Sequence, residues 1–403
     1  MSTHRYLDDP GFQTTLIDLQ DHLRAYPTLK TLNSSAWFSQ NRSKIELILN
    51  HPHVESQFSP TSSKKGWLRC ISWNIEKGKK LDSLLEIFSS DQRFLTADLI
   101  LLQEADFGMA RSGNRCVARE LACALGMNFA FAPCFVELTK GVGEDLKAEG
   151  ENSSGLQGNA ILSRFPIRSA RTIRLPQCFE PFVFAEKRYG NRNAVVCEVG
   201  VVNRDLTAAT THLEVRNSPR CRAHQTAALL KTLGNRGDAF TLIGGDFNSN
   251  TFARGTAWRT VRSLSRLVRM KSDDLLASTL SPQSREPLFD VLYREGYEWE
   301  PFNDGTSTSS TFLRSLEDVH LIPWFLRDRA LETLRPFDGG LPLRLDWFVG
   351  KNVSFAVRPK EKKDLSDAGG PLPPGTITEF EKGIRPESLS DHRPILVDLL
   401  WRP

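Results

Sequence analysis

In the stretch Leu242-Ile243-Gly244-Gly245-Asp246-Phe247-Asn248, an apolar run is followed at once by a carboxylate and a carboxamide, which are side chains that can take part in catalysis. Its beginning, residues 240–243, predicts a buried strand that stops at two glycines. Glycine permits sharp backbone turns that a side chain would obstruct. Asp246 and Asn248 are two residues apart, so both side chains point the same way in an extended run. The pair suits a carboxylate that activates water and an amide that orients it; a strand followed by a plain polar turn is the alternative.

Length and composition predict a soluble globular protein of one large domain or two small ones. The chain has 403 residues, of which 40% are hydrophobic and 25% are charged. Its formal net charge of +4 permits an anionic partner without demanding one. No run approaches the roughly 20 apolar residues of a membrane span, and the first residues contain no apolar signal region. We therefore expect a cytoplasmic protein with no transmembrane segment.

Apolar periodicity divides the chain into a helical N-terminal extension, residues 1–66, and a remainder, residues 67–403, that begins with strand-like sequence. Leucines and isoleucines recur at helical spacing around residues 16–23 and 45–48, and residues 56–66 read as a polar linker. Further helices are predicted at 117–125, 224–233 and 288–296, and a hairpin at 194–211. Residues 360–386 are charged and rich in proline and glycine, which predicts an exposed loop.

Polar side chains stand at or near the ends of the predicted strands. They are Asn74, Glu104, His212, Asp246, Asn248, Asp346, Asp391 and His392. Strands separated by helices and loops indicate a layered α/β protein with its site along one edge of the sheets. Carboxylate and amide oxygens suit Mg²⁺ or Mn²⁺ better than zinc, and the seven cysteines show no paired spacing. The cysteine pattern also argues against a disulfide framework.

Arginines gather in two places outside these strand ends. Arg216, Arg220 and Arg222 follow the strand that ends at His212. Residues 254–271 form a second basic patch, within which residues 258–269 have a basic amphipathic helix pattern. A contact with a phosphate backbone or with a membrane surface is one interpretation. The other is a helix whose charged face is simply solvated.

The ordered motifs resemble those of the endonuclease/exonuclease/phosphatase superfamily, which includes deoxyribonuclease I, tyrosyl-DNA phosphodiesterases and neutral sphingomyelinases. The motifs are Ser-Trp-Asn-Ile-Glu (72–76), Leu-Gln-Glu (102–104), Gly-Asn-Ala-Ile-Leu-Ser (158–163), Thr-His-Leu-Glu (211–214), Gly-Gly-Asp-Phe-Asn (244–248), Leu-Asp-Trp (345–347) and Ser-Asp-His-Arg-Pro (390–394). The resemblance spans about residues 68–402 and leaves the extension and most of an insertion at 251–340 unexplained.

This resemblance implies an α/β (α+β) fold in four layers, two packed β-sheets flanked by helices, as in deoxyribonuclease I. It also assigns roles. Metal ligands would be Glu104, Asn74 and Asp391, and catalytic residues would be Asp246, Asn248, His392, Asp346 and His212. Asp246 would polarise the attacking water with help from Asn248, Asp346 would hold His392 against the phosphate, and His212 would stabilise the phosphoryl oxygens. The resemblance leaves open whether His392 or Asp246 is the base.

We expect a divalent-metal-dependent phosphodiesterase, with Mg²⁺ or Mn²⁺ as cofactor and DNA or RNA as the substrate. The arginine-rich segments favour a polyanion, and Arg222 is the predicted substrate-binding residue. A phospholipid or an inositol phosphate is the alternative substrate. A third hypothesis, a silent binding module that retains the fold, is disfavoured because every expected catalytic residue type is present.

Overall fold

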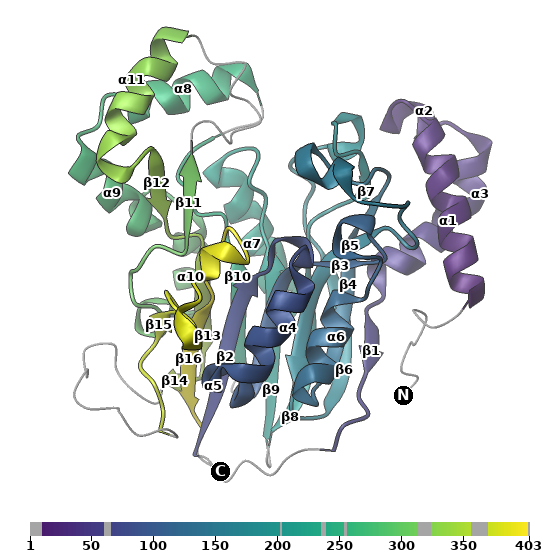
Figure 1. The fold of residues 1–403 in the computed structure, drawn as a ribbon, viewed down its shortest axis with the longest axis horizontal. Coiled ribbons are helices and arrows are strands. Elements are labelled where there is room, and N and C mark those ends of the chain that lie inside the picture. The colour runs from purple at the N-terminus through teal and green to yellow at the C-terminus, as the bar shows by residue number, and fades with distance from the viewer. Residues whose placement is uncertain are drawn as a thin grey trace.

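Two β-sheets pack face to face at the centre of the molecule (Figure 1). The computed structural model describes residues 10–59, 66–201, 204–234, 239–253, 256–312, 324–355 and 370–401. Apolar side chains from both sheets fill the space between them, among them Leu101, Val195, Leu242, Phe348 and Val397. This buried contact between the sheets is the central layer on which the rest of the fold is built.

The first sheet has nine strands, ordered β1-β4-β5-β3-β2-β16-β14, with β7 paired to β4 and β15 to β16. The bounds are β1 His53–Glu55, β2 Trp67–Asn74, β3 Leu99–Phe107, β4 Asn128–Glu137, β5 Leu156–Ser163, β7 Arg188–Gly190, β14 Ser354–Phe355, β15 Gly375–Thr376 and β16 Ile395–Leu400. Strands β2 and β3 run parallel, and their carboxyl ends reach the same edge.

The second sheet has five strands in the order β13-β10-β9-β8-β6. The bounds are β6 Ile167–Arg174, β8 Asn193–Val201, β9 Arg204–His212, β10 Phe240–Asp246 and β13 Asp346–Lys351. Strands β9 and β10 are parallel, whereas β13 is antiparallel to β10. The carboxyl ends of β9 and β10 therefore meet the amino end of β13 at one edge.

Helices cover the outer face of each sheet and complete four layers. Helices α4 (Leu81–Ser90), α5 (Gln92–Leu95) and α6 (Val117–Leu125) share an apolar core with the first sheet. Helices α7 (Pro219–Leu233) and α10 (Leu288–Arg294) share a core with the second sheet. This arrangement confirms the predicted α/β fold of two packed sheets flanked by helices.

The N-terminal helices pack on the same core as the first sheet. They are α1 (Pro10–Ala25), α2 (Leu29–Asn33) and α3 (Ala36–Asn50). Leu16, Leu23 and Ile45 are fully buried in the cluster that also contains Ile100 of β3. Strand β1 follows α3 and pairs with β4. The predicted helices are therefore present, but they are joined to the sheet by packing and by a strand.

Part of the predicted insertion forms a separate lobe above the sheet edge, at the upper left of Figure 1. It contains α8 (Ala257–Leu267), α9 (Ser272–Leu280), α11 (Trp324–Leu334) and the antiparallel strand pair β11 (Ser309–Phe312) and β12 (Gly340–Leu343). Its leucines form a core of their own. The predicted basic helix is α8, and the predicted loop at 360–386 lies partly outside the described residues.

Candidate active site

Three ionisable side chains lie side by side where the second sheet ends. Asp246 is the last residue of β10, and its register pairs it with His212 of β9 on one side and Asp346 of β13 on the other. Asn74 ends β2 of the first sheet, and Glu104 lies in β3. The two sheet edges therefore deliver polar groups to one place from both sides.

Glycine at position 245 is required by the close approach of β10 to β9. Its φ is +155°, and a Cβ built there would lie 2.0 Å from the carbonyl oxygen of Thr211. Asn248 and Glu104 are not glycines, yet they adopt φ of 48° and 56°. Such left-handed backbone costs about 1–3 kcal/mol and persists where the surroundings enforce it. Both unusual conformations occur at residues that point into this site.

Asp246 is almost fully buried and receives polar contacts on both carboxylate oxygens. The backbone N–H of Asn248 donates to Oδ1 at 2.9 Å, and the Asn74 side-chain amide donates to Oδ2 at 3.2 Å. The Nε2 atoms of His212 and His392 lie 3.2 Å and 3.7 Å from Oδ2. Burial raises the pKa of Asp246 to about 7, against the opposing charge of His392. A carboxyl with this pKa can accept a proton near neutral pH.

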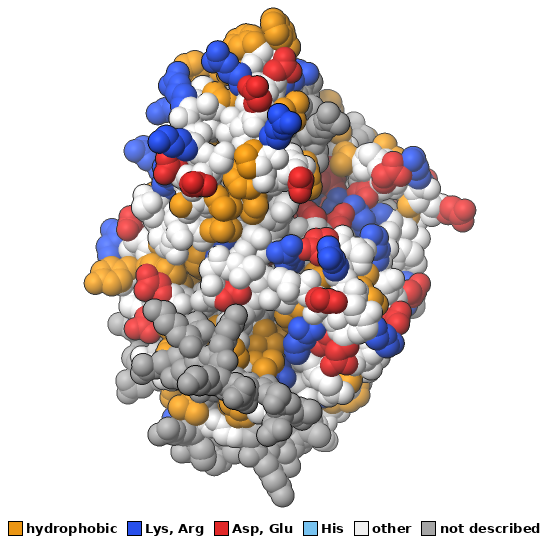
Figure 2. All heavy atoms as spheres, turned by 60° about the vertical axis from the view of Figure 1, so that its left-hand side comes forward, with side chains coloured by type: hydrophobic (Ala, Val, Ile, Leu, Met, Phe, Trp, Pro, Cys, Tyr) orange, Lys and Arg blue, Asp and Glu red, His pale blue; other side chains and the backbone are white. Residues whose placement is uncertain are grey.

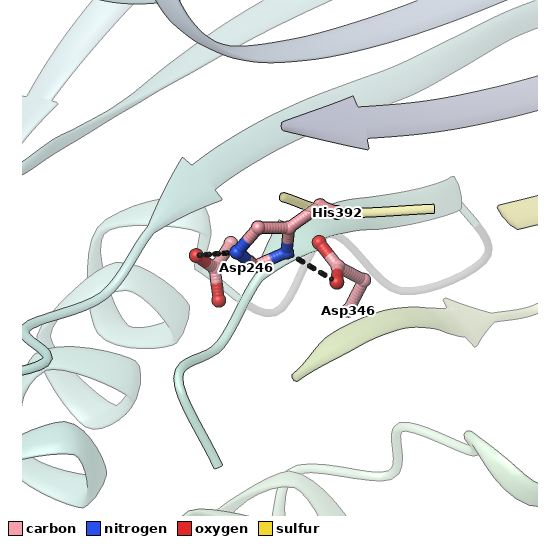
Figure 3. Close-up of side chains that lie close together, drawn as sticks. All are labelled: Asp246, Asp346 and His392. Atoms are coloured by element: carbon pink, nitrogen blue, oxygen red, sulfur yellow. Dashed lines mark hydrogen bonds and ion pairs between the residues drawn. The ribbon is translucent and has the colours of Figure 1, made fainter. Parts of the chain in front are cut away.

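His392 is held between two aspartates (Figure 3). Its Nδ1 lies 2.8 Å from Oδ2 of Asp346, which is fully buried. Burial opposes the charged imidazole, but Asp346, Asp246 and Asp391 together raise the pKa of His392 well above its usual range. His392 therefore favours the protonated form, with Asp346 fixing the orientation of the ring.

The surroundings of His212 shift its pKa in the opposite direction to that of His392. Burial lowers its pKa well below the usual range, and the positive charges of Arg192, His392 and Arg188 act in the same direction. Its Nδ1 lies 3.6 Å from Oε1 of Glu104. The site thus contains one neutral and one protonated histidine on either side of Asp246.

Residues 71–392 match the model of the Endonuclease/Exonuclease/phosphatase family, which is most of the chain and spans every group described above. The chain belongs to this family. Members of the family are hydrolases of phosphoester bonds and generally depend on divalent metals. Among the described residues, no helix combines the length and apolar character needed to cross a membrane.

Several solved structures of the family are similar in fold. An endonuclease/exonuclease/phosphatase from Beutenbergia cavernae DSM 12333 has 15% identity and a TM-score of 0.47, covering 83% of this chain and 72% of that chain. The human Nocturnin catalytic domain has 17% identity and a TM-score of 0.42, with coverage of 87% and 98%. Beta toxin from Staphylococcus aureus has 16% identity and a TM-score of 0.43, with coverage of 82% and 99%. Comparison with curated proteins found no match.

The donors at the mouth of the site fit a hard divalent cation of the kind this family uses. Glu104 keeps a side chain that is 22% exposed, and Asp391 is exposed. Although Asp391 reaches solvent, partial desolvation raises its pKa; the charge of His392 opposes this shift, and repulsion from Glu104 and Glu76 adds to it. A cation would relieve this repulsion, and oxygen donors are the ligands that Mg²⁺ prefers.

A second group of potential ligands lies deeper. Single atoms of Asp246, Asp346 and His392 fall within 4.8 Å of one another, and all three residues are buried. However, the Nδ1 atom of His392 is already hydrogen-bonded to Asp346. Because a protonated histidine cannot ligate a metal, we favour the oxygens of Glu104 and Asp391, which reach solvent, together with the buried Asn74 as the metal donors.

Arg222 does not lie in the site, and its prediction as a substrate-binding residue is wrong. Its side chain is fully buried, and its Nε and terminal nitrogen bond both carboxylate oxygens of Glu286 at 3.1 Å and 2.5 Å. Oε1 of Glu286 also accepts the backbone N–H of Thr251 at 2.7 Å. The pair ties α7 to the loop after Asn248, which is a structural role.

The cysteines also depart from expectation at one point. Cys178 and Cys221 form a disulfide, with Cα atoms 6.2 Å apart and a sequence separation of 43. It links the segment before residue 181 to the first turn of α7. The other five cysteines are free, so no disulfide framework exists.

Three further residues support the site and were missed in the sequence. The Thr308 hydroxyl accepts the backbone N–H of Asp346 at 3.1 Å. The Ser390 hydroxyl donates to the carbonyl of Asn74 at 2.6 Å, and the Trp73 indole N–H donates to the carbonyl of His392 at 2.8 Å. Ser390 and Trp73 stand beside predicted site residues in their motifs. Thr308 has no local signal, because it lies in the insertion.

Proposed function

We propose that this protein hydrolyses a phosphodiester by metal-assisted attack of water, with Asp246 as the base. The observation that supports this best is the arrangement around Asp246 Oδ2, which has Asn74, His212 and His392 within 3.2–3.7 Å. In the proposed reaction the water oxygen bonds to phosphorus as the bond to the leaving alcohol breaks. The water proton passes to Asp246, and the leaving oxygen takes a proton from solvent.

The other side chains have distinct proposed roles. Asn248 orients the water, because its side-chain amide is itself fixed by a 2.9 Å hydrogen bond to the carbonyl of Leu213. Protonated His392, positioned by Asp346, and neutral His212 donate hydrogen bonds to phosphoryl oxygens. A divalent cation bound by Glu104, Asn74 and Asp391 would supply neutralisation of charge on those oxygens.

The arginines near the site support an anionic substrate, but they do not distinguish a nucleic acid from a lipid. Arg222 is unavailable, and Arg216 stacks on Phe179 and Phe184 at 4.9 Å and 5.0 Å from the ring centroids. The remaining support is Arg259, Arg262 and Arg269 on and beside α8, which suit the phosphates of DNA or RNA. A phospholipid or inositol phosphate is the second candidate. An apolar pocket beside Asn248 favours the lipid.

A small substrate without a macromolecular partner tests the reaction itself. We expect hydrolysis of bis(p-nitrophenyl) phosphate in Mg²⁺ or Mn²⁺, and a decrease in kcat of roughly 10²-fold or more for Asp246→Asn. Asp290→Asn, an exposed aspartate on α10, is the matched control and should keep the wild-type rate. Equal rates for the two variants would refute the assignment of Asp246.

A further inference from the structure

An apolar pocket of about 100 Å³ opens beside Asn248, between the catalytic edge and the lobe. Its apolar wall consists of Leu264 and Leu267 of α8, Leu334 of α11, Leu341 and Leu343 of β12, and Leu345. These leucines come from two stretches of sequence, residues 264–267 and 334–345, so the pocket forms where the lobe meets the segment that leads to Asp346. The lobe therefore supplies a surface for a substrate group next to the proposed reaction.

The size and chemistry of the pocket identify that group. An apolar cavity of about 150 Å³ holds benzene, so this smaller space accepts a few carbons of an alkyl chain and not a purine base. A base would also leave its polar edge unpaired against leucine. At the wall, the buried hydroxyl oxygen of Thr260 has no hydrogen-bond partner among the described residues. Such a hydroxyl could bond the carbonyl of an acyl group.

A basic groove lies between α8 and the start of α7. It has a volume of about 660 Å³, and its lining includes Trp258, Arg259, Arg262 and Arg269 on one side and Ser218 on the other. Within the described part of the chain, none of the three exposed arginines at 259, 262 and 269 forms an ion pair with a carboxylate, although Arg259 donates to the side-chain oxygen of Asn217 at 2.8 Å. These unneutralised charges suit anionic headgroups.

Large aromatic side chains project from the same lobe. Trp258 and Trp324 are each 74% exposed, and Phe325 is 53% exposed. In Figure 2 hydrophobic side chains cap the tip of the molecule, and Lys and Arg side chains lie beside them. Tryptophan next to basic residues is typical of surfaces that rest in the headgroup region of a bilayer.

We infer that the substrate is a phospholipid taken from an anionic membrane surface, on which the α8–α11 lobe docks. Trp258, Trp324 and the arginines contact the bilayer, the leucine pocket receives part of an acyl chain, and the phosphodiester then lies at Asp246. This inference rests on the proposed phosphodiester hydrolysis. A nucleic acid could also stack on tryptophan and pair with arginine, but it has no group that fits the leucine pocket.

Docking is tested without catalysis by sedimenting the protein with vesicles in EDTA. Vesicles of phosphatidylcholine containing phosphatidylserine should bind the protein, and added salt should weaken the binding. The double variant Trp258→Ser, Trp324→Ser should bind about tenfold more weakly or worse, because two interfacial side chains are lost. Tyr293→Ser, 77% exposed on α10, is the control and should bind as the wild type does. Binding of a single-stranded oligonucleotide without binding of vesicles would overturn the inference in favour of nucleic acid. An equal loss of vesicle binding in the double tryptophan variant and in Tyr293→Ser would overturn it as well.

The pocket is tested by substrate selectivity. Wild-type protein should hydrolyse vesicle phospholipid, and Leu341→Trp should lower the ratio of its kcat/KM for phospholipid to that for bis(p-nitrophenyl) phosphate by about tenfold. Leu47→Trp, at a 59% exposed position on α3, should leave the ratio unchanged. If Leu341→Trp does not fold, the test is the wild-type kcat/KM for phospholipids of different acyl length, which should be higher for long than for short acyl chains. Hydrolysis of bis(p-nitrophenyl) phosphate but of no phospholipid would overturn this inference alone, whereas failure on both substrates would overturn the proposed function.

Discussion

At the residue scale, the site depends on aspartates that are buried beside histidines. Asp246 and Asp346 lie on neighbouring strands, and His392 bridges them. Burying a carboxylate costs free energy unless a nearby positive charge compensates it. The imidazolium of His392 supplies that charge to both aspartates, and the aspartates in turn stabilise the protonated imidazole. The contacts that offset the cost of burying these three side chains also set the protonation states proposed for the reaction.

The role of Asp346 can be separated from folding. We predict that Asp346→Asn lowers kcat for bis(p-nitrophenyl) phosphate by roughly 10²–10⁴-fold with little change in KM, because the ring of His392 loses its orientation and charge. A thermal melt checks that the variant is folded. A kcat within about twofold of the wild type would show that Asp346 does not position His392.

Glu137 is a second buried carboxyl, in β4, and it gives a prediction about pH and stability. Neither of its oxygens has a hydrogen-bond partner among the described residues, and the terminal nitrogens of Arg111 and Arg188 lie 3.7 Å and 3.6 Å away. Burial, followed by repulsion from Glu186, raises its pKa to about 7. The carboxyl therefore contributes stability below about pH 4.5, and this contribution is lost as the pH rises through 7.

Glu137→Gln removes that titration. Between pH 5 and pH 8 we expect the free energy of unfolding to fall by about 1–3 kcal/mol more in the wild type than in the variant. Urea unfolding at the two pH values measures this difference. Glu144→Gln, whose parent side chain is 84% exposed, is the control. Parallel pH profiles for wild type and Glu137→Gln would contradict the raised pKa.

At the element scale, the end of β10 is the most constrained piece of backbone. Gly245→Ala would place a Cβ against the Thr211 carbonyl and force a left-handed region that alanine avoids. We predict a loss of about 2 kcal/mol or more in the free energy of unfolding, measured in urea. Gly66→Ala, where a Cβ would meet nothing within 4 Å, should be neutral by comparison. A neutral Gly245→Ala would mean that β9 and β10 can separate at little cost.

Elements with a strong local pattern could be predicted from the sequence, and those fixed by distant partners could not. Helix α6 has the predicted bounds, because Val117 and Leu121 repeat at helical spacing and Gly126 ends the helix. Helix α7 begins at Pro219, five residues before the predicted start, because proline at the first position of a helix resembles a loop in sequence. Arg222 was predicted to bind substrate because its buried partner, Glu286, is 64 residues away and gives no local signal.

The candidate site shows the same division. Asp246, His212 and Asn74 could be predicted because strands that end in polar residues deliver them to one edge. Thr308, which holds the backbone of Asp346, lies in the insertion and has no motif of its own. The disulfide between Cys178 and Cys221 could not be predicted, because no local spacing marks a pair 43 residues apart.

At the scale of the whole molecule, the N-terminal helices and the sheets behave as one packed body. Leu16, Leu19, Leu23, Ile45 and Leu49 are all at most 2% exposed in the core that covers the first sheet. A chain that begins at residue 67 would expose the apolar surface beneath them. We predict that such a chain is insoluble or lacks a cooperative thermal transition, and a soluble, active protein would instead support residues 1–66 as a separable extension.

The central claim is that metal ligands on one sheet and Asp246 on the other act on the same phosphodiester. The most direct measurement is the rate of bis(p-nitrophenyl) phosphate hydrolysis by wild-type protein stripped of metal with EDTA, followed as Mg²⁺ is restored. We predict no hydrolysis in EDTA and a rate that rises with Mg²⁺ to saturation. The same rate with and without the metal would contradict the claim.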